Sequence, residues 1–492
     1  MPDTLHVQTG AAVPRGGAGR FVSGSILRHV VVMSGTGSIG LMAIFFVDLL
    51  SLLYVSKLGD PVLTAGVGFA AIVQFFAISI NIGLMIAAGA LVSRAIGEGD
   101  EAGARRIAAS ASLHGLVVSV LLVVLLLAVL HPLLRAVGAD EHTVPIAERF
   151  LWITLPSNVL MGPGMLFSGL LRAVGAAREA MYVTLGGAVM TAFVDPILIF
   201  GLQLGVDGAA ITTCLARATF LAVGWAGVRK YRMLARPRLS AAVDDAPLVS
   251  RIALPAMLTN LAPAVAGAFV AHAISQFGTA AVAANVVTDR LAPVAFCGLY
   301  AMSGSIGPIL GQNWGARRFD RMRGVLRTGV GVTAVYVLAV GLILVLARGP
   351  LTRLFELRGV AADLFAFFCL ACGPIWFFNG LLFLSNASFN NLGFPIASTA
   401  LNWGRATLGT MPPALGGAAL FGPEGVIAGV GVGSLVFGLL ALILAFRTVR
   451  TLERRAGLLQ TGIDPAETAA SASTTSGAVV RTPRIGAANG IS

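Results

Sequence analysis

Two acidic residues lie inside strongly apolar stretches of this chain, and they are the residues best suited to bind a cation. Asp48 lies within the apolar run of residues 40–54, and Asp195 lies within the run of residues 180–203. An ionised aspartate at the middle of a bilayer costs about 2.5–3.5 kcal/mol, so a membrane protein keeps one where it pairs, faces water or works. When two carboxylates share one apolar pocket, it is unfavourable for both to be ionised at the same time. Binding of one proton or one Na⁺ then neutralises the pair.

The elements that must position these carboxylates are membrane helices. The chain has 492 residues, of which 57% are hydrophobic and 11% are charged, whereas a soluble domain carries about 25% charged residues. A helix needs about 20 apolar residues to span a bilayer. Twelve stretches of this kind are predicted, at 27–54, 62–92, 104–130, 144–170, 180–203, 207–228, 249–275, 280–309, 325–347, 361–385, 395–420 and 425–447. The predicted fold class is an all-α polytopic membrane protein with twelve transmembrane helices.

Weak internal repeats divide these helices into two halves. Short segments of the first half resemble segments 217 to 219 residues later: Lys57–Ala65 and Gln276–Ala284, Arg172–Gly175 and Asn390–Gly393, Gly205–Gly208 and Gly422–Gly425. Because six helices is an even number, both halves enter the membrane from the same side. The chain is therefore predicted to form two pseudo-symmetric six-helix bundles with a cavity between them, which is a transporter architecture.

The predicted domains are a disordered cytoplasmic arm, an N-terminal six-helix lobe, a cytoplasmic linker, a C-terminal six-helix lobe and a largely disordered cytoplasmic tail, at residues 1–26, 27–230, 231–248, 249–450 and 451–492. Arginines gather in alternate connecting segments, and basic loops stay in the cytoplasm. Both termini are therefore expected in the cytoplasm, with the chain in the inner (plasma) membrane. This topology explains the net charge of +12, and no basic-aromatic patch predicts nucleic-acid binding. The expected partners are a small molecule and the lipid bilayer, and the expected state is a monomer.

Several short segments resemble the multidrug and toxic compound extrusion (MATE) family. They are Val47–Asp48 with Lys57–Gly59 after it, Ala90–Asp100, Arg172–Gly175, Asp195–Gly201 and Gly311–Arg321. Their order and spacing are specific together, and the resemblance covers residues 27 to 450. It implies the MATE fold and a cation-coupled exporter of cationic, amphipathic compounds. Apart from Asp363 at an edge, the spans 249–275 and 361–385 lack acidic residues, which favours the prokaryotic DinF-like branch.

The resemblance also implies which residues bind the coupling ion. Asp48 and Asp195 would form the site, with a hydroxyl from Thr213, and Thr191 stands where the family commonly has Asn. The coupling ion held by Asp48 and Asp195 is either a proton or a Na⁺, and the sequence does not decide between them. No cofactor is expected. Neither acid recurs at the equivalent position of the second half, so the site is predicted in the N-terminal lobe alone. The alternatives are that each acid pairs with a buried arginine such as Arg217, and that Thr213 bonds to its own helix.

The residues predicted to contact a substrate are polar, aromatic or methionine side chains of the first half: Gln74, Asn81, Phe45, Met190 and Phe193. Methionine and aromatic side chains adapt to varied ligands, but they serve equally well in a core or against lipid. Gln74 and Asn81 share one face of a helix and are equally suited to helix–helix hydrogen bonds. Asp289–Arg290 lies in the eighth predicted span. Two roles remain possible for these residues: a local ion pair or a second coupling site.

The predicted function is secondary active multidrug export, in which organic cations or amphipaths leave by alternating access while H⁺ or Na⁺ enters. One alternative is a lipid-linked oligosaccharide flippase of the wider superfamily, although the intramembrane arginines do not cluster as a diphosphate lipid would require. A remote alternative is an intramembrane enzyme, but the sequence has no HExxH or GxSxG motif. The chain is therefore not expected to be an enzyme.

Overall fold

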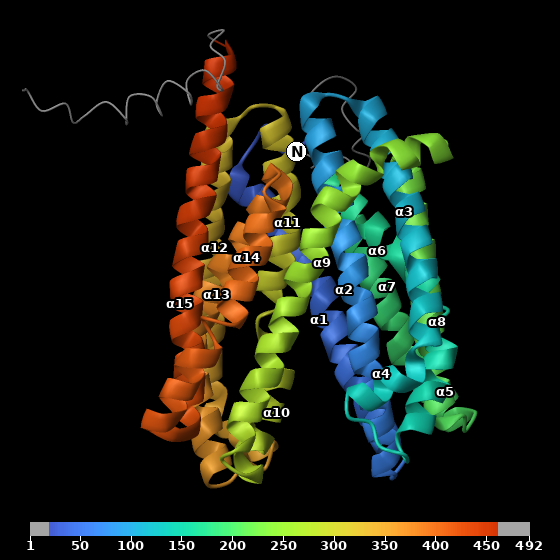
Figure 1. Cartoon of the computed structure of the whole chain (residues 1–492), viewed down its shortest axis with the longest axis vertical. Coiled ribbons are helices and arrows are strands. Elements are labelled where there is room, and N and C mark those ends of the chain that lie inside the picture. The colour runs from blue at the N-terminus through green and yellow to red at the C-terminus, as the bar shows by residue number, and fades with distance from the viewer. Residues whose placement is uncertain (1–18, 461–492) are drawn as a thin grey trace, which may run out of the picture. The chain divides into compact units, whose positions relative to one another are not determined.

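The computed structural model describes residues 19–460, and these residues form helices without a β-strand (Figure 1). The helices are α1 (Ile26–Ser56), α2 (Pro61–Glu98), α3 (Glu101–Ala128), α4 (Leu130–Ala136), α5 (Val144–Thr154), α6 (Asn158–Ala173), α7 (Ala177–Pro196), the π-helix η1 (Ile197–Gly201), α8 (Gly205–Lys230), α9 (Leu239–Ser275), α10 (Thr279–Ala295), α11 (Cys297–Gly315), α12 (Phe319–Leu354), α13 (Val360–Leu392), α14 (Pro395–Ala406) and α15 (Met411–Gln460). The contacts divide the chain after Ala445 into two units. Of the second unit, only the end of α15 lies among the described residues.

All twelve predicted spans are found in the described part of the chain. It contains nine helical segments that are long and apolar enough to cross a membrane, and two bent pairs, α5 with α6 and α10 with α11, complete two more spans. The last segment, Pro395–Gly457, has 63 residues and would be about 95 Å long as one helix. It is two spans, because the backbone turns at Gly422 (φ 65°) and a Cβ on Gly417 would lie 2.0 Å from the Gly425 carbonyl oxygen.

The helices of the first unit form two lobes. In the N-terminal lobe α1 packs on α7, α7 on α8, and α2 on α3 and α6; in the C-terminal lobe α9 packs on α14, and α13 packs on α10, α11 and α12. The lobes meet where α11 contacts α1 and α2, and where α9 contacts α2. Figure 1 shows α1, α2, α9 and α11 together at the centre. The apolar core of the first lobe extends into the second, since Val249 and Ile252 of α9 pack with the residues of α2, α3 and α6.

The lobes touch most closely at the end where α1 begins and α11 ends. A Cβ added at Gly97 of α2 would lie 2.1 Å from the carbonyl oxygen of Gln312, and one at Gly315 of α11 would lie 2.2 Å from that of Arg94. Glycine permits such an approach because it has no Cβ. The Arg94 guanidinium also lies 4.0 Å from the centre of the Trp314 ring. The two lobes are therefore closed against each other at this end.

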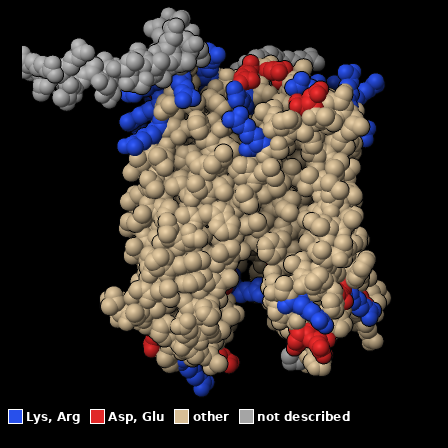
Figure 2. Space-filling model, in the orientation of Figure 1, with Lys and Arg blue, Asp and Glu red and all other residues tan. Residues whose placement is uncertain are grey.

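We call this the arginine-rich end, after Arg94, Arg106, Arg238, Arg317 and Arg321. Figure 2 shows basic side chains gathered there, and it shows the molecule hollowed between the lobes at the opposite end. In Figure 1 α10 of the C-terminal lobe and the second half of α1 stand on either side of this hollow. We call the hollow the cleft. The molecule is thus open from one side only, as one state of an alternating-access transporter must be.

The structure differs from the predicted domain boundaries at three places. The predicted disordered arm is ordered from Gly19, because Phe21 is buried between the lobes, its N–H donates to Gln312 Oε1 at 2.9 Å, and Arg321 donates to its carbonyl oxygen at 3.0 Å. Helix α9 begins at Leu239 within the predicted linker, and α15 continues to Gln460 within the predicted tail. The rest of the arm and tail, residues 1–18 and 461–492, lies outside the described residues.

Candidate functional site

Asp195 lies at the end of α7, where the helix changes type. Pro196 follows it and cannot donate a backbone hydrogen bond, and the chain continues as the π-helix Ile197–Gly201. Such π-helical turns are rare and occur frequently at functional sites. Asp195 is only 1% exposed. The local sequence therefore holds a carboxylate in the interior of the N-terminal lobe, at a break in regular helix.

The Asp195 carboxylate has one satisfied oxygen and one unsatisfied oxygen. Ser51 of α1 donates its hydroxyl to Oδ2, whereas the buried Oδ1 accepts no hydrogen bond from the described residues. Thr212 of α8 lies next to the carboxylate, but its hydroxyl donates to the Gly208 carbonyl oxygen at 3.0 Å. An unpaired buried carboxylate oxygen is costly. A proton or a cation at Oδ1 would remove that cost.

Asp48 lies one helical turn before Ser51 on α1. Its side chain is exposed rather than buried among the described residues, and both Asp195 and Arg290 of α10 lie within electrostatic range of its carboxylate. Gly40 allows α1 to approach α7, since a Cβ there would lie 2.0 Å from the Thr184 hydroxyl. The structure thus brings the two predicted acids together, one buried and one exposed, with Ser51 as the link. We call Asp48, Ser51 and Asp195 the acid cluster.

The two predicted threonines donate their hydroxyl protons locally. Thr191 donates to the carbonyl oxygen of Gly187 and Thr213 to that of Ala209, each at 3.0 Å. A hydroxyl that donates in this way still has lone pairs for a cation. Ser51 was not predicted from the sequence. The one feature of the sequence that could have identified Ser51 is its position three residues after Asp48, because this spacing places both side chains on one face of the helix.

Arg217 does not pair with either acid. Its guanidinium donates to the Thr154 carbonyl oxygen at 2.6 Å, to the Ser157 hydroxyl at 3.0 Å and to Gln74 Oε1 at 2.7 Å. Gln74 in turn donates to the Thr154 hydroxyl at 3.3 Å. The expected alternative, in which Arg217 neutralises an aspartate, is therefore not observed. Arg217 instead joins α2, α5 and α8.

The other predicted substrate contacts have separate surroundings. Asn81 is 1% exposed and bonds to Asn158 at 3.3 Å and to Ser119 at 3.2 Å, so it joins α2 to α3 and α6. Phe193 is 69% exposed on α7, and Met190 is partly buried. Neither Asn81 nor Gln74 is free to contact a solute without losing these helix–helix hydrogen bonds.

Phe45 belongs to a group of aromatic rings between the lobes. Its ring meets that of Tyr300 of α11 at 6.2 Å, and Tyr300 in turn lies 5.1 Å from Phe383 and 6.2 Å from Trp376. Trp376 stacks on Phe296 with the ring centres 4.6 Å apart. Phe45 precedes Asp48 by three residues, toward the arginine-rich end. We call Phe45, Phe296, Tyr300, Trp376 and Phe383 the aromatic floor.

Among residues 19–460 no group of three or more His, Cys, Asp or Glu side chains is arranged to hold a metal ion. A Na⁺ at the acid cluster would therefore depend on hydroxyl and carbonyl oxygens beside the two carboxylates. Hard cations prefer such all-oxygen sites. The residues present fit a proton or a small monovalent cation better than a transition metal.

Two repeated lobes of helices, a cleft open at one end and two acids within membrane helices are the features of a transporter. The chain belongs to the MatE family, whose sequence model matches residues 38–197 and again residues 255–414. The two matches begin 217 residues apart, as the internal repeats predicted. The predicted family and fold class are confirmed.

The chain is similar to several transporters along most of its length. It is 28% identical over 445 residues to the FAD transporter of Shewanella oneidensis, covering 87% of this chain and 96% of that protein. It is 28% identical over 433 residues to the probable multidrug resistance protein NorM of Pseudomonas syringae, covering 81% and 90%. The crystal structure of a mutant of the Vibrio cholerae MATE transporter VcmN is similar with a TM-score of 0.82 and 25% identity, covering 87% of this chain and 98% of that one.

Proposed function

We propose that the protein is a multidrug exporter that exchanges cationic or amphipathic compounds for H⁺, with Na⁺ as the alternative ion, at the acid cluster. The observation that carries this proposal is the buried Asp195 carboxylate with an unpaired oxygen, held by Ser51 on the same helix as the exposed Asp48. Relatives named as multidrug resistance and multidrug export proteins support the same function. A transport role, and no enzymatic one, follows from this proposal.

The proposed cycle uses the open cleft and the closed end in turn. The arginine-rich end is cytoplasmic by the positive-inside rule, so the described state faces outward. A proton enters through the cleft, reaches Asp48 first and then neutralises the acid cluster. Loss of negative charge weakens the attraction for a cationic cargo, which leaves outward. The coupling is reciprocal, so cargo bound from the cytoplasm favours release of the proton.

The aromatic floor is the proposed contact surface for the cargo. Tyr300 is about one-third exposed, and its neighbours Phe45, Trp376 and Phe383 are partly buried. Aromatic faces attract organic cations, by about 0.5–2 kcal/mol for each well-placed ring. One turn further along α1, Asp48 adds a negative charge when it is deprotonated. An aromatic surface beside a switchable carboxylate suits flat cationic compounds.

A flavin dinucleotide is a second candidate cargo. The Shewanella relative is named an FAD transporter, and the exposed Arg290 near Asp48 offers a positive charge to a diphosphate. The same aromatic floor would stack on an isoalloxazine ring. Arg290→Gln would then weaken FAD transport and leave transport of a cationic dye intact or improved.

The test is transport by the full-length protein in proteoliposomes under imposed gradients. An organic cation dye and FAD are offered in parallel, with a pH gradient, a Na⁺ gradient or neither. The proposal predicts accumulation of the dye that requires a cation gradient and collapses when an ionophore dissipates it. Dye movement that is indifferent to both gradients would contradict secondary coupling, and movement of FAD alone would select the second cargo.

A further inference from the structure

One arginine is buried inside the C-terminal lobe without a partner. Arg405 lies near the end of α14, within the apolar segment Pro395–Gly457, and it is 9% exposed. Among residues 19–460 its guanidinium has neither an ion pair nor a hydrogen bond, and its Nε is fully buried. An arginine inside a membrane span is costly, and such residues commonly mark the binding site or pathway of a charged solute.

A second buried arginine, Arg217 of the N-terminal lobe, has a different role. It is 6% exposed, and its guanidinium donates to the Thr154 carbonyl oxygen, the Ser157 hydroxyl and Gln74 Oε1. The donors of Arg217 are therefore used within the fold. Because a buried donor without an acceptor is unfavourable, the unused donors of Arg405 indicate an acceptor that the chain does not supply.

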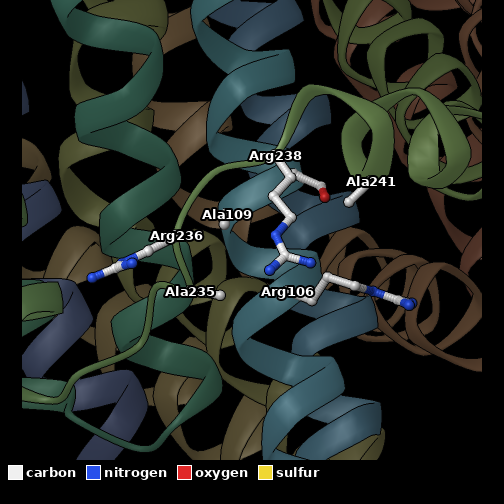
Figure 3. Close-up of a pocket in the computed structure, with 7 residues that line it drawn as sticks. Arg106, Ala109, Ala235, Arg236, Arg238 and Ala241 are labelled. Carbon is white, nitrogen blue, oxygen red and sulfur yellow. The ribbon is translucent and has the colours of Figure 1, made fainter.

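The arginines of the arginine-rich end differ from Arg405. Figure 3 shows Arg106, Arg236 and Arg238 with their guanidinium groups directed to different sides. Arg106 contacts the Asp245 carboxylate at 3.4 Å, and Arg236 and Arg238 are exposed in the connection before α9. Membrane topology alone accounts for such basic segments. It does not account for Arg405, which lies within an apolar span.

The register of two helices places Arg405 beside the aromatic floor. Asn386 of α13 accepts hydrogen bonds from Ser398 and Asn402 of α14 at 3.0 and 2.8 Å, so this face of α14 packs on α13. Because only a short turn connects the two helices, they run antiparallel. Arg405 is one turn after Asn402 on α14, and Phe383 of the aromatic floor is one turn before Asn386 on α13.

Tyr300 of the aromatic floor also lies near Arg405. Its side chain is within electrostatic range of the Arg405 guanidinium. Its ring is 5.1 Å from that of Phe383, and Ser303, one turn later on α11, donates to the Phe383 carbonyl oxygen at 3.3 Å. Tyr300 is 36% exposed, so the aromatic surface next to Arg405 is accessible to a solute.

We propose that Arg405 binds the carboxylate of a zwitterionic aromatic cargo whose rings lie on the aromatic floor. This inference rests on the proposed export function and adds zwitterions to its cargo. A guanidinium recognises a carboxylate through two parallel hydrogen bonds. On the N-terminal lobe, Phe45 of the floor is one turn from Asp48. A zwitterion thus places its anionic group at Arg405 in one lobe and its cationic group toward Asp48 in the other.

The test is binding of two rhodamines to the purified full-length protein, measured by fluorescence polarisation without any ion gradient. One rhodamine has a free carboxylate and the other is its methyl ester, so only the first is a zwitterion. We expect the wild type to bind the free acid about tenfold more tightly than the ester, as one charge-assisted pair provides. Arg405→Gln should remove this preference and change the affinity for the ester by less than about twofold.

The matched control is Arg358→Gln, which removes one exposed arginine from the same lobe and should keep the preference. If melting curves show that Arg405→Gln is unfolded, Arg405→Met replaces it, because methionine retains an apolar stem. Excess acetate at constant ionic strength is expected not to displace the free acid, since acetate has no ring to lie on the aromatic floor.

The proposal is overturned if the wild type binds acid and ester equally, if the Arg405 variant keeps the preference, or if the control loses it as well. Displacement by acetate would show a site for a small anion and overturn the assignment to cargo. These results would leave the export function standing, because transport of a cationic dye tests it separately. Binding of neither rhodamine would contradict this inference and the aromatic floor as a cargo surface.

Discussion

At the scale of single residues, the acid cluster combines an exposed carboxylate with a buried one. Asp48 is exposed, and the buried Asp195 carboxylate has the unpaired oxygen. We predict that Asp48→Asn and Asp195→Asn each lower coupled dye export by about 10- to 100-fold, because either change removes an ionisable group from the coupling step. Export is measured in cells, with the membrane level of each variant checked by immunoblot.

Asp60→Asn is the matched control for these variants. Asp60 caps α2 through a hydrogen bond to the Val62 N–H at 2.8 Å, and asparagine caps helices equally well. The Asp60→Asn variant should therefore export the dye at the wild-type rate. Export at the wild-type rate by both Asp48→Asn and Asp195→Asn would exclude the acid cluster as the coupling site.

Arg217 is predicted to serve stability rather than transport. Its three hydrogen bonds join α2, α5 and α8, and removing one partner of a buried, charged hydrogen bond costs about 1–3 kcal/mol. Arg217→Met should therefore lower the melting temperature of the purified protein clearly, whereas the exposed Arg229→Met should not. An unchanged melting temperature for Arg217→Met would contradict this role.

The sequence predicted some of these residues and not their partners. An acid in an apolar run is visible in sequence because burial of its charge is costly, so Asp48 and Asp195 were predicted. The hydrogen-bond partner of a polar residue depends on which helix packs against it. The spacing of residues within one helix does not determine which helix that is. For this reason Gln74 and Asn81 remained open between cargo and helix contacts, and Ser51 was not identified.

At the scale of helices, the close approach of α2 and α11 holds the arginine-rich end closed. A Cβ at Gly97 would lie 2.1 Å from the Gln312 carbonyl oxygen, which is backbone and has little room to move. We predict that Gly97→Ala shifts the protein away from the outward-facing state. The measurement is disulfide formation between Arg94→Cys and Trp314→Cys in a background without the native cysteines.

Gly68→Ala, in the same helix, is the control, because nothing lies within 4 Å of a Cβ there. The cross-link should form readily in the control and several-fold less in Gly97→Ala. Equal cross-linking in both would mean that this contact does not limit closure.

The sequence predicted the helices well, since apolar length and turn residues are local properties. It did not predict that Phe21 would be buried between the lobes, because that contact depends on Gln312, which is 291 residues away along the chain.

At the scale of the whole molecule, the repeat and the arginine distribution predict the orientation in the membrane. Two matches to one family model at residues 38–197 and 255–414 confirm the doubled architecture. We predict that both termini are cytoplasmic. A green fluorescent protein fused to the C-terminus should fluoresce, and alkaline phosphatase fused there should be inactive. Active phosphatase would reverse the orientation and make the described state inward-facing.

Which end is open could not be predicted from the sequence. The closed and open states contain the same helices and differ in contacts between lobes, such as those of Gly315 with Arg94. Both states must be accessible to one sequence if the lobes exchange access. The arrangement of repeats therefore predicts the architecture, and the structure shows which end of it is closed.

The central claim is that cargo and ion compete through the acid cluster. The most direct measurement is proton release when a cationic dye binds the purified protein in weakly buffered, Na⁺-free solution with a pH indicator. The account predicts release by the wild type, and dye binding without release by Asp195→Asn. Dye binding by the wild type without any proton release, or undiminished release by both Asp195→Asn and Asp48→Asn, would contradict it.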